Sequence, residues 1–126
     1  MQDLIKEFLN QRNFAVVGSF RDESKYAYKI LKDLIRKRCK VYPVNPNIKE
    51  VEGLKCYPSI PNISEPIDVV DIVTPPVVTE QIVKQCLQKG ITRVWMQPGA
   101  ESEQAINFCN DNNIKVVYNA CVMLGK

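Results

Sequence analysis

Two structural signals follow each other in the segment Phe14-Ala-Val-Val-Gly-Ser-Phe-Arg-Asp-Glu-Ser-Lys25. The apolar run at its start ends at Gly18, which predicts a short buried strand. Ser24 stands where a residue could cap a helix running from about Lys25 to Lys37. A strand, a glycine turn and a helix in this order form the first half of a βαβ unit.

The same alternation continues outward along the chain. Further strands are expected at Cys39–Val44, Asp68–Val73, Arg93–Met96 and Lys115–Tyr118. Further helices are expected near Leu4 to Leu9, at Val77–Lys89 and at Glu101–Asn112. The segment from Ile48 to Glu65 is rich in Pro and Asn and is expected to hold short turns or a minor strand.

This pattern predicts an α/β fold with a single domain over residues 1–126. We expect a Rossmann-like, doubly wound parallel sheet of about five strands with helices on both faces. Right-handed βαβ connections give the strand order 3-2-1-4-5 as the simplest arrangement.

Composition restricts the classes of function. The net charge of +3 is too small to indicate a nucleic-acid partner, and the basic residues between Lys29 and Lys40 fit a solvated helix face. No run of about 18 apolar residues occurs, so a soluble, cytoplasmic protein without a membrane partner is expected. The five cysteines are widely spaced without a C-x-x-C motif, so neither a disulfide framework nor a metal site is expected.

Histidine is absent from the chain, which excludes Ser-His-Asp triads and Cys-His dyads. Cys121 follows the last expected strand without a base to activate it, so we assign it a structural role. Glu101 and Glu103 complement the start of a helix and are not assigned to acid–base work. No catalytic residue is therefore assigned, and a binding protein is favoured over an enzyme.

The residues that end the strands indicate a ligand site, because ligands of such folds bind outside the carboxyl ends of the strands. The first turn and the helix that follows it suit a phosphate group. The residues expected to bind there are Gly18, Ser19, Arg21, Ser24 and Lys25. An ordinary capped turn with surface charges is the alternative.

The first turn lacks the three glycines of the G-x-G-x-x-G dinucleotide fingerprint. The second strand ends in Asn45 and Pro46, where a classical NAD site has an acidic residue. A neutral residue there fits a more phosphorylated ligand, and coenzyme A carries a 3′-phosphate beside its pyrophosphate. A plain turn at this position remains equally compatible with the spacing.

The third and fourth strands end in residues that suit the walls of a pocket. Thr74, Pro75 and Pro76 give a stiff apolar wall, although proline also simply ends a strand and starts a helix. Gln97 and Gly99 follow the fourth strand and are expected to line the pocket floor. Trp95 is expected to pack in the core or at an interface.

Four motifs in this order resemble the CoA-binding domain family, a stand-alone relative of the N-terminal domain of the succinyl-CoA synthetase α subunit. They are V-V-G-S-F-R-D-E-S-K-Y-A-Y at residues 16–28, Y-P-V-N-P at 42–46, V-D-I-V-T-P-P at 70–76 and V-W-M-Q-P-G-A-E-S at 94–102. The resemblance implies a Rossmann-like fold that binds coenzyme A along the strand ends. It places the ribose and adenine at Asn45 and Pro46. The synthetase works through a phosphohistidine in a further domain, and this chain has no histidine.

Three functions follow from these observations. The first is a non-catalytic module that binds coenzyme A or an acyl-CoA as a carrier, sensor or accessory protein. The second is a subunit of a CoA-using enzyme whose chemistry comes from a partner, and the third is an NAD(P)-binding redox sensor. The expected partner is a small nucleotide ligand, and a homo-oligomer or an enzyme partner is left open.

Overall fold

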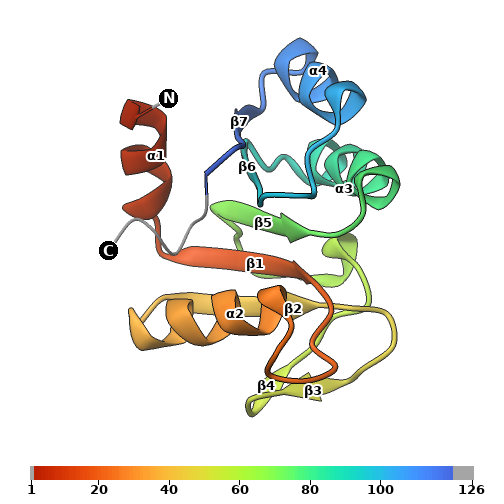
Figure 1. Ribbon diagram of the computed structural model, residues 1–126. Coiled ribbons are helices and arrows are strands. Elements are labelled where there is room, and N and C mark those ends of the chain that lie inside the picture. Colours follow the sequence, from red (N-terminus) through yellow and green to blue (C-terminus); the bar gives the residue numbers. More distant parts are fainter. Residues whose placement is uncertain (1, 121–126) are drawn as a thin grey trace.

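The computed structural model describes residues 2–120, which form an α/β fold around one parallel five-stranded sheet (Figure 1). Its strands are β1 (Asn13–Gly18), β2 (Lys40–Val44), β5 (Val69–Val73), β6 (Arg93–Met96) and β7 (Lys115–Val117). All pairings in this sheet are parallel. The Rossmann-like class predicted from the alternating pattern is confirmed.

The spatial order of the strands is β2-β1-β5-β6-β7, which is 2-1-3-4-5 when the strands of this sheet are counted along the chain. The third strand thus pairs with the first, whereas the simplest expected order, 3-2-1-4-5, placed it beyond the second. Pro43 gives a physical reason, because a residue without an N–H is tolerated at a sheet edge and not in an interior strand. The switch in strand order therefore lies between β1 and β5.

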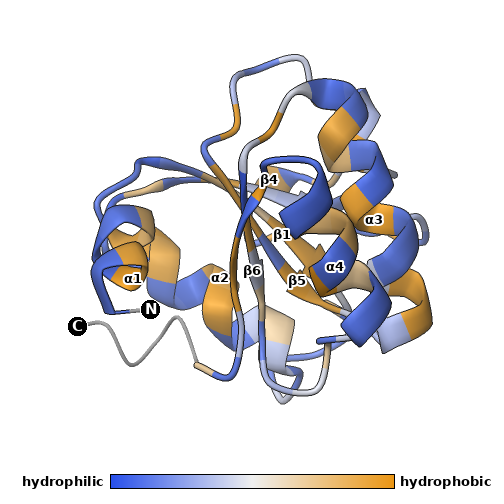
Figure 2. Ribbon diagram, turned by 90° about the horizontal axis from the view of Figure 1, so that it is seen from above, coloured by the Kyte–Doolittle hydropathy of each residue, from blue (hydrophilic) through white to orange (hydrophobic). Residues whose placement is uncertain are grey.

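Helices cover both faces of the sheet, as expected (Figures 1 and 2). On one face lie α1 (Gln2–Leu9) and α2 (Tyr26–Arg36), and on the other lie α3 (Pro76–Lys89) and α4 (Glu103–Asp111). Side chains alternate along β1, so Phe14 and Val16 pack into the core between the sheet and α1 and α2. Ala15 and Val17 pack into the core between the sheet and α3 and α4.

The leading helix α1 is fixed by apolar and charged contacts. Phe8 is fully buried, and its ring meets Trp95 edge to face with ring centroids 6.0 Å apart. Trp95 is also fully buried and donates from Nε1 to the Ala120 carbonyl at 2.7 Å, so it packs in the core. Glu7 accepts from Arg93 at 2.8 Å and from Lys115 at 2.9 Å, which lowers the pKa of the Glu7 carboxyl.

The helix starts differ in how they are capped. Ser102 caps α4, because its Oγ accepts from Ala105 N at 3.0 Å. Ser24 does not cap α2, so that prediction is wrong: Lys25 occupies the N-cap position without a side-chain cap. The Ser24 hydroxyl instead donates to the Asp22 carboxylate, which also accepts from Ser24 N at 2.9 Å. The Ser24 hydroxyl is thus bonded to Asp22 and does not cap the helix. The two hydrogen bonds from Ser24 lower the pKa of the Asp22 carboxyl.

The connection from β2 to β5 holds more structure than the sequence indicated. It contains a two-stranded hairpin, β3 (Glu50–Val51) and β4 (Leu54–Lys55), and a short 3₁₀ turn, η1 (Ile60–Asn62). Glu52 and Gly53 form the hairpin turn with φ angles of 52° and 76°, the positive values that a two-residue turn of this kind requires. Tyr28 on α2 donates to Glu52 at 2.5 Å, which ties the hairpin to the helix and raises the pKa of Tyr28 to about 12.

Candidate functional site

The carboxyl ends of the central strands carry two separate cavities. The first, here called the loop cavity, has a volume of about 650 Å³ and lies at the ends of β1 and β2. The second, here called the proline cavity, has a volume of about 270 Å³ and lies at the ends of β5 and β6. The loop cavity is lined by Ser19, Phe20, Arg21, Asn45, Asn47, Ile48 and Glu50, and the proline cavity by Val73, Thr74, Pro75, Pro98, Gly99 and Ala100.

The loop cavity is lined by charges of both signs, Arg21 and Glu50, and its Arg21 side offers the features that an anionic group favours. Arg21 lines it and is exposed, and α2 begins close by without a side-chain cap or an acidic residue in its first turn. The positive end of a helix dipole and a guanidinium both favour phosphate. Lys25 stands at the N-cap of α2, outside the lining of the cavity.

Gly18 shapes this corner by allowing two elements to pack closely. A Cβ atom built on Gly18 would lie 2.6 Å from the Ala27 Cβ on α2 and 2.9 Å from the Val73 carbonyl oxygen on β5. Both distances are shorter than side chains tolerate, so only glycine lets α2 approach the sheet here. Gly18 therefore sets the position of the loop that carries Ser19 and Arg21.

Asn45 fastens the ends of β1 and β2 together. Its Nδ2 donates to the Gly18 carbonyl at 2.7 Å, and its Oδ1 accepts from Asn47 N at 2.8 Å. Asn45 thus lines the loop cavity with a side chain whose amide oxygen and nitrogen both hold the protein's own backbone. Its neighbour Pro46 is exposed and lies outside both cavity linings.

Asn45→Ala is expected to lower the free energy of unfolding by about 1 to 2 kcal/mol, because it leaves the Gly18 carbonyl and the Asn47 N–H without their partner. Urea denaturation at pH 7 measures this loss. Asn47→Ala is the matched control, since the exposed Asn47 engages Asn45 through its backbone, and it should change stability by less than about 0.5 kcal/mol. Equal effects of the two substitutions would contradict the role given to Asn45.

The proline cavity is uncharged. Thr74 Oγ1 lies 2.9 Å from Thr79 Oγ1, and Pro75 occupies the N-cap of α3. Gly99 has a φ of 94°, a value that favours glycine, and its N–H donates to Glu101 Oε1 at 3.0 Å. Pro76 starts α3 and lies outside the lining.

Gln97 lies beneath this cavity, in the core. Its side chain is fully buried, and Nε2 donates to Asp71 Oδ1 at 3.2 Å. Its backbone N–H donates to Ile72 O at 3.0 Å, and its carbonyl accepts from Ala100 N at 2.9 Å. Gln97 thus anchors the β6–α4 turn from below, and the structure does not bring it to the surface of the cavity as expected.

Asp71 is a buried acid that the sequence analysis did not single out. It lies in the middle of β5 with no exposed surface, beside Val16 and Trp95 on the neighbouring strands. Desolvation raises its pKa to about 8, against a smaller lowering by the hydrogen bond from Gln97. Among the described residues, its Oδ2 has no hydrogen-bond partner. An acid within the apolar run Val-Val-Asp-Ile-Val was the available signal.

The structure thus sorts the expected binding residues into groups. Ser19, Arg21 and Asn45 line the loop cavity, and Thr74, Pro75 and Gly99 line the proline cavity. Gly18 and Gln97 lie buried behind these linings, and Ser24, Lys25, Pro46 and Pro76 lie outside them. The residues that the sequence reasoning missed are Phe20, Asn47, Ile48, Glu50, Val73, Pro98 and Ala100.

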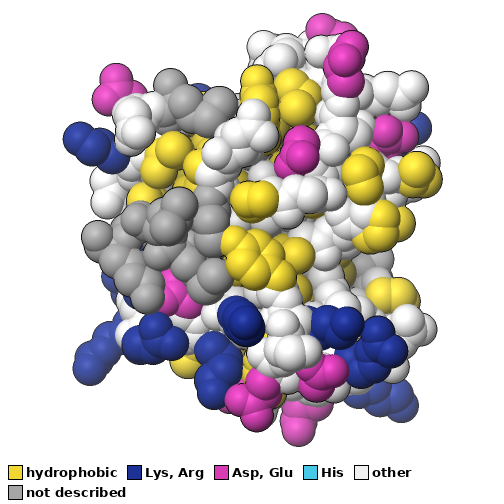
Figure 3. Space-filling view, viewed as in Figure 1, with side chains coloured by type: hydrophobic (Ala, Val, Ile, Leu, Met, Phe, Trp, Pro, Cys, Tyr) yellow, Lys and Arg dark blue, Asp and Glu magenta, His cyan; other side chains and the backbone are white. Residues whose placement is uncertain are grey.

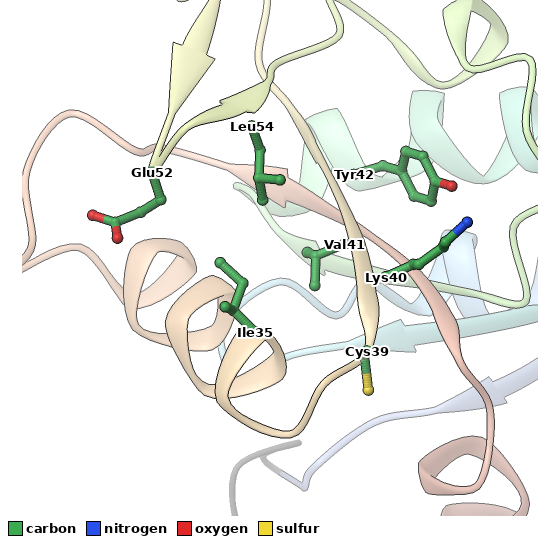
Figure 4. A pocket seen from close by; sticks show the side chains of 7 residues that line it. All are labelled: Ile35, Cys39, Lys40, Val41, Tyr42, Glu52 and Leu54. Carbon is green, nitrogen blue, oxygen red and sulfur yellow. The ribbon is translucent and has the colours of Figure 1, made fainter.

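A third cavity of about 390 Å³ lies along β2, away from the strand ends that carry the candidate site (Figure 4). Ile35, Val41 and Leu54 converge in it, and Lys40 and Glu52 stand at its sides. No residue expected to bind a ligand lines it.

The four described cysteines are free thiols. Burial raises the pKa of Cys39, Cys56 and Cys86, and raises that of Cys109 to about 12, so none of them is a ready nucleophile. Cys121 lies outside the described residues. Within residues 2–120, no group of three or more acidic or cysteine side chains is placed to hold a metal, and no helix has the length and apolar character to cross a bilayer.

Comparison with known proteins places the chain among proteins of related sequence and fold. The family described as CoA binding domain matches residues 12–125. The ADP-forming acetate–CoA ligase of Methanocaldococcus jannaschii is 32% identical over 106 residues, and the chain spans 84% of its own length but only 15% of the ligase. YneT of Bacillus subtilis is 26% identical over 119 residues, which cover 94% of this chain and 88% of YneT.

A solved structure extends this likeness to three dimensions. A conserved hypothetical protein from Pyrococcus furiosus superposes with a TM-score of 0.88 at 40% identity, covering 92% of this chain and 100% of that protein. The family match, the sequence relatives and the shared fold agree with the motifs at the strand ends. The chain belongs to the CoA binding domain family.

Proposed function

We propose that this protein binds coenzyme A or an acyl-CoA at the carboxyl ends of its strands, as a sensor, carrier or accessory module. The observation that carries the proposal is the contrast between the two cavities: one is lined by Arg21 and Glu50 close to a helix start without a side-chain cap, and the other has no charged residue in its lining. Coenzyme A has the same polarity, with phosphates at one end and a neutral thiol arm at the other.

The spacing of the cavities suits an extended ligand. The strand ends run from β2 through β1 and β5 to β6. Three strand spacings of about 4.8 Å give roughly 14 Å between the outer two. A ligand that fills both cavities must be long and must carry its charges at one end.

Basic side chains are concentrated in the segment that contains α2. Residues 21–40 hold eight basic and three acidic side chains, although the whole chain has a net charge of only +3. Lys and Arg gather on the side of the molecule where α2 and the β3–β4 hairpin lie (Figure 3). Of these residues, Arg21 and Lys25 flank the start of α2 and support binding of the anionic end of the ligand there, whereas Arg36 ends the helix and Lys40 begins β2 at the opposite edge of the sheet.

Thermal denaturation with a panel of nucleotides tests the proposal. A specific ligand at 100 times its Kd adds about 2.7 kcal/mol of stability, which raises Tm by about 10 °C for a chain of this size. CoA and acetyl-CoA should give the largest shifts, ahead of NAD, NADP and ATP. A shift with NAD or NADP alone would contradict CoA binding and would favour the redox sensor.

Arg21→Glu is expected to weaken CoA binding by about tenfold or more, because it removes a charged hydrogen-bond donor and repels the phosphates. Isothermal titration calorimetry measures the change in Kd. Lys25→Glu should have a smaller effect, since Lys25 does not line the cavity. Lys84→Glu, on exposed α3 and outside both cavities, is the matched control, and an equal loss there would refute the role of Arg21.

The link to ligase relatives supports a second form of the proposal. In it, the chain serves a CoA-using enzyme whose chemistry comes from a partner protein. The described residues hold neither a histidine nor a thiol with lowered pKa, which fits a chain that presents a ligand without reacting with it.

A further inference from the structure

The lining of the proline cavity is uncharged, but two carboxylates accept hydrogen bonds from the turn after β6 that supplies part of this lining. Glu101 is half-buried and does not itself line the cavity, but its Oε1 accepts from the N–H of Gly99, a lining residue, at 3.0 Å, so its carboxylate lies next to the lining. Glu80 accepts from the Ser102 hydroxyl at 2.7 Å, which places a second carboxylate at the start of α4. None of the residues that line this cavity is basic.

These features decide which chemical groups the cavity favours. The Gly99 N–H is a donor in the lining that could bind an entering oxygen anion, and Glu101 already occupies it. An anionic group would therefore lose a partner and meet a like charge. A neutral group encounters neither difficulty, because proline rings and the Ala100 methyl are apolar.

The size of the cavity sets a second limit. Its volume of about 270 Å³ equals that of about nine liquid water molecules. That space suits the end of a thiol arm with a short acyl group, and a long fatty chain would extend out of it.

We propose that the proline cavity receives the thioester end of an acyl-CoA and that Glu101 restricts it to short, uncharged acyl groups such as acetyl. Dicarboxylic acyl groups such as succinyl are disfavoured, because their free carboxylate approaches Glu101. This inference rests on the proposed CoA-binding function and adds to it the class of acyl group and a residue that selects it.

Coulomb's law sets the size of the selectivity. We take two like unit charges about 6 Å apart in a partly hydrated cavity with an effective dielectric constant between about 40 and 80. Their repulsion lowers the affinity for a charged acyl group about three- to tenfold relative to a neutral one. Acetyl-CoA should therefore bind the unsubstituted protein about three to ten times more tightly than succinyl-CoA.

Isothermal titration calorimetry with CoA, acetyl-CoA and succinyl-CoA tests the inference on the full chain. Glu101→Gln keeps an oxygen acceptor for the Gly99 N–H and removes the charge, so the ratio of the succinyl-CoA and acetyl-CoA dissociation constants should fall about three- to tenfold. Glu103→Gln is the matched control, because Glu103 is exposed on the first turn of α4 and outside the cavity, and the ratio should stay unchanged.

The outcomes separate this inference from the function on which it rests. Equal binding of acetyl-CoA and succinyl-CoA by the unsubstituted protein, or an equal fall of the ratio in both variants, would overturn the role of Glu101 and leave CoA binding in place. Absence of binding by all three ligands would overturn the proposed function itself. Thermal denaturation of each variant without ligand confirms that the fold is retained.

Discussion

Asp71→Asn is expected to stabilise the protein by about 2 to 3 kcal/mol at pH 7. Burial raises the pKa of Asp71 from the ordinary 3.8 of an aspartate side chain to about 8 in the folded state, so the acid must take up a proton to stay buried at neutral pH. About three pKa units at 1.36 kcal/mol each give a cost near 4 kcal/mol, and asparagine does not incur it. An amide N–H without a partner at the Oδ2 position reduces the gain by about 1 to 2 kcal/mol.

The pH dependence of this effect has a definite sign. Between about pH 4 and pH 8 the folded state binds more protons at Asp71 than the unfolded state does. The stability of the unsubstituted protein therefore falls as the pH rises through that range, and this contribution levels off above about pH 8. Asp71→Asn removes this slope, so its advantage should be small near pH 4 and largest near pH 8.

Urea denaturation of both proteins at several values between pH 4 and pH 8.5 measures this difference. Asp111→Asn, at an exposed position near the end of α4, is the matched control and should change stability by less than about 0.5 kcal/mol. A less stable Asp71→Asn protein at pH 8, or parallel pH curves for the two proteins, would show that Asp71 is ionised in the fold.

Gly18→Ala is expected to destabilise the protein by about 3 kcal/mol and to weaken CoA binding. The new methyl group would meet the Ala27 Cβ at 2.6 Å and the Val73 carbonyl oxygen at 2.9 Å. Neither atom belongs to a flexible side-chain end, so α2 must move away from β1 and β5. That movement displaces Ser19 and Arg21, which line the loop cavity.

A double-mutant cycle with Ala27→Gly isolates the cause. Ala27→Gly alone should cost about 1 kcal/mol as a glycine within a helix, but it removes the nearer of the two clashing atoms. The double variant should therefore be more stable than the sum of the single losses predicts, by about 1 kcal/mol or more. Strict additivity, or a Gly18→Ala protein as stable as its parent, would show that close packing is not the reason for this glycine.

Local sequence patterns predicted the elements of the fold well because periodicity and turn residues act over a few positions. The apolar runs ending at Gly18, Val44, Val73 and Met96 are strands, and the polar and proline residues after them meet at one edge of the sheet. The alternation of strands and helices does not by itself predict that β5 lies beside β1. The additional signal is the proline inside β2, because proline favours a strand at the edge of the sheet.

Side-chain roles were harder to predict, because they depend on which of several possible hydrogen-bond partners each side chain takes. Ser24 had the right type and place for a cap, yet Asp22 competes for its hydroxyl. Asn45 stood at a strand end, yet its amide bonds the Gly18 carbonyl, 27 residues away. Ile48 and Glu50 line the loop cavity because the hairpin folds back, which the composition of that segment did not reveal.

The sequence by itself determined the alternation of strands and helices, and with it the edge of the sheet where we propose that a ligand binds, since these follow from short-range periodicity and backbone sterics. Only the tertiary structure decided which polar groups at that edge stay available. Gln97 is drawn into the core by Asp71, and the Gly99 N–H is taken by Glu101. Burial and hydrogen-bond pairing arise from contacts between strands and turns, so they exist only once the sheet has formed.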